Sequence, residues 1–157
     1  MIERALFAGY YRFDSLNILT GERVVTKYKN ALTQGFFSAI HQFLRYSESL
    51  PDSDALDITR VAFGEGTTPA SRNDSVLVDE QYRKSPASRS FTNTLFTVRA
   101  VLAAGEWNPT GGYIKEVGIF AKATDTTDDG NLLSRAVVNV QKNSNIQLSI
   151  TWELRMV

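Results

Sequence analysis

The sequence contains no cysteine and only one histidine. The absence of cysteine excludes disulfide bonds, thiolate catalysis and cysteine-ligated zinc. A serine triad or a histidine metal site would have to use His41, and no second histidine exists to share a metal. On a predicted helix His41 lies near the polar residues Gln34 and Ser38, so we expect a solvated side chain. We therefore expect no enzyme activity, no catalytic residue, no metal and no cofactor.

The sequence also lacks net charge and long apolar runs. Its 17 basic and 17 acidic residues cancel, so the broad positive field typical of nucleic-acid-binding proteins is missing. No run approaches the roughly 18 apolar residues that a membrane-spanning helix needs, and the first residues lack the pattern of a signal peptide. We expect neither a nucleic-acid partner nor a membrane partner. A basic and aromatic cluster fits a solvated rim better than a phosphate site; it consists of Tyr82, Arg83, Lys84, Arg89 and Phe91.

What is present is the composition of a globular protein. The chain has 157 residues, of which 43% are hydrophobic and 22% charged. These values are typical of one domain with a sizeable core. We predict a single domain over residues 1–157, in which residues 1–50 form an N-terminal hairpin and a helix and residues 58–157 form the sheets.

One helix is predicted, from about residue 27 to residue 47. Apolar residues recur there at intervals of three and four, which places them on one face of a helix. They are Tyr28, Leu32, Phe36, Ala39, Ile40 and Phe43. Thr26 or Asn30 would cap the start of this helix. Upstream, Thr20 and Gly21 predict the turn of a hairpin.

The second half of the chain is predicted to be almost entirely β. Apolar and β-branched residues indicate strands at 58–63, 91–103, 113–121, 132–140 and 145–157, the last three forming an antiparallel meander. In the final strand, six apolar residues from Ile146 to Met156 alternate strictly with polar ones. Such alternation predicts a sheet with one buried face. We therefore predict a mainly β fold, an antiparallel, jelly-roll-like β-sandwich packed with one helix.

Glu116 is the most informative charged residue of the sequence. In the strand at 113–121 it alternates with Ile114 and Phe120 and should share their face. A carboxylate on an apolar face needs a partner. The candidates are Arg83, Arg99 and Arg135. We predict a structural ion pair formed by Glu116, Arg83 and Arg135.

Two loops invite a ligand interpretation. Asp125, Asp128 and Asp129 crowd the segment 125–131, and their oxygens suit a hard cation. Their spacing differs from that of an EF-hand, and Asp129 followed by glycine is typical of a hairpin turn. The sequence is compatible with two interpretations of this segment, a plain turn and a weak cation site. The loop at Gly64 and Gly66 lacks the third glycine of a dinucleotide site and the lysine of a P-loop, so no nucleotide site is expected.

An ordered set of motifs resembles virion proteins of tailed bacteriophages. A strand at 58–63 enters a loop and a following segment with Gly64, Gly66, Pro69, Asp74, Leu77, Glu80 and Arg83. A later strand reads Ile-Lys-Glu-Val-Gly-Ile-Phe at 114–120, and Gly-Asn-Leu-Leu at 130–133 and Leu-Ser-Ile-Thr-Trp at 148–152 follow. Tail-collar and tail-fibre attachment domains carry a related arrangement. The resemblance covers residues 58–157, with a weaker similarity at 29–40.

The resemblance implies a non-enzymatic virion protein of the neck, tail or baseplate, assembled in the host cytoplasm. Such a protein acts as an adaptor or attachment subunit, forms a homo-oligomer around an axis and contacts other virion proteins. A capsid decoration protein is the alternative. The predicted contact surface consists of Phe7, Tyr10, Tyr11, Phe13, Gly64, Gly66 and Pro69. The aromatic segment at 6–13 has a second interpretation, in which it begins the monomer's own sheet.

A carbohydrate-binding β-domain is a further alternative, because such sandwiches stack sugars on exposed aromatic side chains. Trp107 and Trp152 are the two tryptophans. Trp152 lies on the alternating apolar face of the last strand, and Trp107 lies in a predicted turn. At most one tryptophan is therefore expected to be free for a host-surface glycan.

Overall fold

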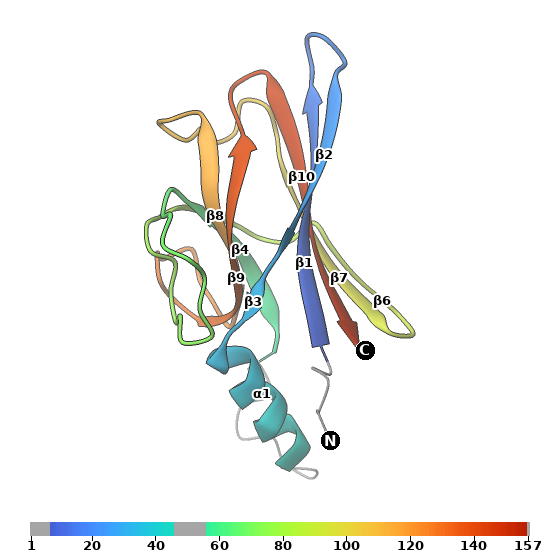
Figure 1. The fold of residues 1–157 in the computed structure, drawn as a ribbon, viewed down its shortest axis with the longest axis vertical. Coiled ribbons are helices and arrows are strands. Elements are labelled where there is room, and N and C mark those ends of the chain that lie inside the picture. Colours follow the sequence, from blue (N-terminus) through green and yellow to red (C-terminus); the bar gives the residue numbers. More distant parts are fainter. Residues whose placement is uncertain (1–6, 46–55, 157) are drawn as a thin grey trace.

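The computed structural model describes residues 7–45 and 56–156, and these form a sandwich of two antiparallel five-stranded sheets (Figure 1). Sheet A has the order β2-β1-β10-β7-β6, and sheet B has the order β3-β9-β8-β4-β5. The strands of sheet A are β1 (Phe7–Asn17), β2 (Arg23–Lys29), β6 (Ser88–Thr92), β7 (Leu95–Leu102) and β10 (Ile146–Met156). The strands of sheet B are β3 (Ala31–Leu32), β4 (Ile58–Gly64), β5 (Glu80–Lys84), β8 (Tyr113–Ala121) and β9 (Asn131–Gln141). The predicted mainly β sandwich with one helix is confirmed.

The main core lies between the two sheets. Phe13 of β1 and Trp152 of β10 contribute buried rings from sheet A, and Phe63 of β4 contributes one from sheet B. The hydroxyl of Tyr11 crosses the core and donates to the carbonyl oxygen of Ser134 at 3.2 Å. Burial raises the pKa of this tyrosine. The apolar residues of β10 from Ile146 to Trp152 are thus buried, as their pattern predicts, whereas Leu154 is half-buried and Met156 is 48% exposed.

The helix α1 (Gln34–Arg45) is shorter than predicted. The sequence interpretation began it at residue 27, but residues 27–29 end β2, where the hydroxyl of Tyr28 donates to the carbonyl oxygen of Asn139 at 3.1 Å. Thr33, and neither predicted residue, caps the helix: its hydroxyl accepts from the Phe36 amide at 3.4 Å. Residues 46 and 47 of the predicted helix lie outside the described residues.

The helix lies at one end of the sandwich, beyond β3 and next to β9 (Figure 1). Its apolar face packs inward: the ring of Phe36 meets that of Phe7 edge-on, with centroids 5.3 Å apart. Within the described residues no helix has the length and apolar character needed to cross a membrane. The helix therefore closes one end of the sandwich with Phe36 and Ala39, whereas Phe43 of the predicted apolar face is 58% exposed.

Two features of the strand order differ from the sequence interpretation. The predicted strand at 91–103 is a hairpin, because Asn93, with φ of 44°, turns the chain between β6 and β7. The predicted meander at the C-terminus is correct for β8 and β9, which pair antiparallel, and wrong for β10, which pairs with β1 and β7 in sheet A. The last strand is consequently a central strand of the other sheet. Val157, predicted to end it, lies outside the described residues.

Candidate functional site

Glu116 lies on the outer face of sheet B, beneath the loop of residues 65–79. The pairing register between β8 and β9 shifts between Ile114 and Glu116, and the alternation of β8 changes at this point. Ile114 therefore belongs to the core between the sheets, whereas Phe120 belongs to a smaller cluster with Leu77 and Leu132. The prediction that Glu116 shares a face with Ile114 is wrong. The register shift turns the Glu116 carboxylate to the outer face, where the loop covers it completely.

The Glu116 carboxylate accepts hydrogen bonds from the loop backbone. Its Oε1 accepts from the amides of Gly66 at 3.1 Å and Asp79 at 2.7 Å, and its Oε2 accepts from the amide of Val78 at 3.0 Å. Arg135 of β9 donates to Oε2 through Nε at 2.9 Å. Charge-assisted bonds of this kind are the stronger class of hydrogen bond. One side chain thus ties both ends of the loop to the sheet.

Arg135 holds the middle of the same loop. It has no exposed surface, and its guanidinium donates to Asp74 Oδ2 and to the carbonyl oxygen of Thr68, each at 2.9 Å. The guanidinium geometry suits several simultaneous acceptors. Together with Glu116 it forms what we call the loop anchor, which is defined by these two residues.

The loop anchor explains two glycines. A Cβ atom on Gly64 would lie 2.3 Å from the carbonyl oxygen of Asp79, and one on Gly66 would lie 2.5 Å from Glu116 Oε1. Any larger residue would push the loop off the carboxylate. Both glycines are buried, so the prediction that they form a contact surface is wrong. Pro69 of the same predicted surface is exposed.

Arg83 forms a separate ion pair with Glu80. Arg83 Nη2 donates to Glu80 Oε2 at 2.8 Å, and Arg83 Nη1 donates to the carbonyl oxygens of Thr124 and Asp129 at 2.9 and 3.0 Å. The guanidinium lies over the ring of Phe120, 4.9 Å from its centroid. The structure therefore brings Glu116 together with Arg135, whereas Arg83 holds the loop of residues 122–130 instead.

The aromatic segment at the start of β1 is largely internal. Tyr11 and Phe13 have no exposed surface, because they face the core between the sheets. Their prediction as contact residues is wrong, and the alternative interpretation, in which the segment begins the monomer's own sheet, describes them. Phe7 is half-buried against the helix, and Tyr10 is half-buried on the outer face.

Neither tryptophan offers an open platform for a sugar. Trp152 is 1% exposed. Trp107 is half-buried and stacks on Tyr82 with an interplanar angle of 5° and on Phe63 with one of 28°. The Tyr82 hydroxyl donates to Glu106 Oε1 at 2.7 Å, and burial raises the pKa of Tyr82 to about 12. These contacts use the aromatic faces inside the protein.

The acidic loop of residues 122–130 is a turn with internal hydrogen bonds. Asp129 Oδ2 accepts from the amide of Thr124 at 2.7 Å, which lowers the pKa of Asp129. Asp128 has a φ of 61°, a conformation that aspartate tolerates in turns. Across residues 7–45 and 56–156, no group of three or more acidic or histidine side chains is arranged to hold a metal ion. The side chain of His41 is exposed.

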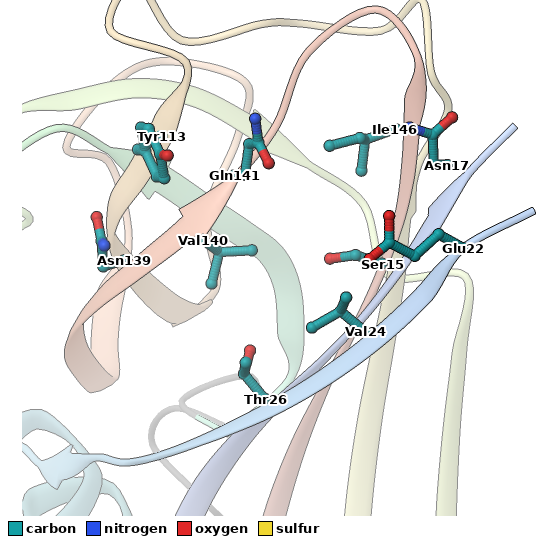
Figure 2. Close-up of a pocket in the computed structure, with 10 residues that line it drawn as sticks. All are labelled: Ser15, Asn17, Glu22, Val24, Thr26, Tyr113, Asn139, Val140, Gln141 and Ile146. Atoms are coloured by element: carbon teal, nitrogen blue, oxygen red, sulfur yellow. The ribbon is translucent and has the colours of Figure 1, made fainter. Parts of the chain in front are cut away.

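An open cleft separates the two sheets at the end opposite the helix (Figure 2). Its volume is about 230 Å³. Ser15, Val24 and Thr26 line it from sheet A, and Asn139 and Val140 face them from sheet B (Figure 2). The lining mixes hydroxyl, amide and aliphatic groups. The sequence interpretation missed this cleft, since it depends on how far two sheets diverge.

Comparisons of the chain with protein-family models, curated proteins and solved structures find no match.

Lys142 is a further residue that sequence reasoning missed. It has no exposed surface, and its Nζ donates to Asn108 Oδ1 at 2.8 Å and to the carbonyl oxygen of Ala104 at 3.1 Å. Burial lowers the pKa of this lysine. It ties the loop of residues 103–112 to the end of β9. No periodicity in the sequence signals such a contact.

Proposed function

We propose that this chain is a non-enzymatic structural subunit of a tailed-phage particle, at its neck, tail or baseplate. Its work is to bind copies of itself and other virion proteins. The sandwich supplies a rigid body, and its surfaces and strand edges supply the contacts.

The observation that carries this proposal is that the residues of the phage-like motifs contact one another. Glu116 of the later motif accepts from Gly66 and from the segment that precedes β5. Asp74 of the earlier motif pairs with Arg135 at 2.9 Å, and Leu77 packs on the second core cluster. The motifs thus make one structural device, a loop held on a sheet. The hydrogen bonds and the ion pair of these residues hold the loop in place.

The exposed surface supports binding as the function. In sheet A the edge strands are β2 and β6, and every residue of β6 is exposed. Val25 of β2 is 49% exposed and Phe91 of β6 is 65% exposed. Free strand edges with apolar side chains favour pairing with another protein surface.

Light scattering on the purified chain tests this proposal. We expect a defined oligomer at micromolar to millimolar concentration, since subunits arranged around an axis contact one another. Lysozyme of similar mass serves as the monomeric reference. A monomer over the whole concentration range would contradict the proposal.

A further inference from the structure

The outer face of sheet A is strongly basic. The core residues of its strands point inward, so the alternate positions point outward. The outward cations are Arg12, Arg23, Lys27, Lys29, Arg99 and Arg155, and all are exposed. The outward carboxylates are Asp14 and Glu153, and both are half-buried. Six cations against two carboxylates give this face a formal charge of +4 in a chain whose net charge is zero.

The two carboxylates of the basic face are already paired. Glu153 Oε2 lies 2.9 Å from Lys27 Nζ. Asp14 accepts from Arg23 Nε at 2.7 Å, which lowers the pKa of Asp14. Between Arg12 and Arg99 the face has a shallow hollow of about 450 Å³. A carboxylate of a partner would find guanidinium and hydroxyl donors in this hollow.

The opposite side of the molecule is acidic. Two loops lie against sheet B, away from sheet A (Figure 1). The loops of residues 65–79 and 122–130 together contain six acidic and two basic residues, a formal charge of −4. Asp79, Asp125 and Asp128 are exposed. Partial desolvation and the neighbouring charge of Glu80 raise the pKa of Asp128, as expected where negative charges gather.

Each of these surfaces also carries exposed apolar side chains. Val25 lies on the basic face and is 49% exposed. Val76 and Val78 lie on the acidic loop of residues 65–79 and are 37% and 54% exposed. Stable interfaces combine an apolar centre with charged surroundings. The two surfaces are therefore opposite in charge, and each carries exposed valine side chains.

We propose that the basic outer face of sheet A binds the acidic loop side of a second copy of this chain. The inference rests on the proposed function and specifies which surfaces meet. Because the two surfaces lie on opposite sides of the sandwich, the contact is head-to-tail. Repetition of such a contact gives a ring where the rotation closes and a filament where it does not.

The charge pattern favours a second copy over nucleic acid. A polyphosphate partner would meet two carboxylates within the basic face, and nothing in that interaction would use the acidic loops. A copy of the same chain carries charge of the opposite sign on its other side, although Asp125 there is already paired with Arg60 at 2.9 Å. Complementary charge of this kind sets the orientation and speed of association.

Paired charge reversals test the proposal. The face variant carries Arg12→Glu and Arg99→Glu, and the loop variant carries Asp79→Lys and Asp125→Lys. All four positions are exposed. Asp128 is left unchanged because its φ of 61° would strain a lysine. Lys115→Glu is the control. Lys115 lies on β8, where it donates to Asn139, and the substitution reverses a positive charge that belongs to neither surface. Thermal unfolding checks that each variant is folded.

We expect self-association of the wild type to weaken at least about tenfold between low and high salt. Each variant alone should be monomeric, since its two reversals bring the formal charge of the altered surface to zero and so remove its attraction for the unaltered, charged surface of another copy. An equimolar mixture of the two variants should associate again, because each then supplies the surface that the other needs. The Lys115→Glu control should behave as the wild type.

Three results would overturn the inference, and they can be told apart. If the oligomeric state changed neither with salt nor in either variant, the proposed contact between these two surfaces would be wrong. The proposed function would not be affected. A wild type that is monomeric under all conditions would refute both. Unchanged oligomers, with retention on double-stranded DNA lost only in the face variant, would assign the basic face to nucleic acid.

Discussion

Replacing Glu116 by glutamine should lower the free energy of unfolding by about 3–5 kcal/mol, the usual cost of breaking a buried ion pair. Glutamine leaves the guanidinium of Arg135 without its charge partner at a position with no exposed surface. It also turns an amide NH₂ group toward backbone amides that now donate to the carboxylate. Urea denaturation followed by tryptophan fluorescence measures the change.

The matched control for this prediction is Glu153→Gln. Glu153 also pairs with a cation at 2.9 Å, but its partner Lys27 is on the surface. Surface pairs contribute about 0–1 kcal/mol, so this variant should unfold close to the wild type. Equal effects of the two substitutions would show that the loop anchor is not a buried pair.

Replacing Trp152 by alanine should cost about 3–5 kcal/mol, because it removes a large buried ring from a central strand. Trp152 is 1% exposed and meets the ring of Phe96 edge-on, with centroids 6.2 Å apart. Its strand β10 pairs with β1 on one side and with β7 on the other. The lost contacts therefore lie at the centre of sheet A. Calorimetric melting measures the loss through a lower Tm.

Met156→Ala on the same strand is the control for Trp152→Ala. Met156 is 48% exposed at the end of β10, so its truncation should change stability by less than about 0.5 kcal/mol. A Trp152→Ala protein as stable as this control would mean that the last strand is not packed in the core.

Much of the fold can be predicted from the local sequence pattern. The errors in the prediction of the helix and of one strand also have local causes. The alternation from Ile146 onward predicts the buried face of β10, because a strand repeats every two residues. The helix start was wrong because Tyr28 and Leu32 imitate helical spacing while they lie on two different strands. Asn93 splits the predicted strand at 91–103 through a positive φ that its neighbours do not signal.

The partition of strands between the two sheets could not be predicted from pattern. The strands β9 and β10 are consecutive and both amphipathic, which favours a hairpin. They belong to different sheets because β10 fits between β1 and β7. Such a choice depends on contacts between residues more than 100 positions apart, as between Tyr11 and Trp152.

The candidate site was predicted only in part. An acidic residue on a half-apolar strand correctly indicated that Glu116 needs a partner. The sequence offered three arginines as candidate partners of Glu116, since the choice depends on which strand lies beside β8. The backbone amides that complete the loop anchor carry no sequence signature at all. The basic face was hidden by the zero net charge, because its charges become a pattern only when alternate strand positions are assigned to one side.

Zero-length cross-linking of an isotope mixture tests most directly whether the chain works by contacting its own copies. Unlabelled and heavy-nitrogen-labelled protein are mixed, equilibrated and treated with a carbodiimide that joins lysines to carboxylates. The link between Lys27 and Glu153, 2.9 Å apart in one chain, provides the intramolecular reference and should never mix isotopes. The account predicts isotopically mixed links from Lys27 or Lys29 to Asp79 or Asp125. Links that are all unmixed, at every position, would contradict it.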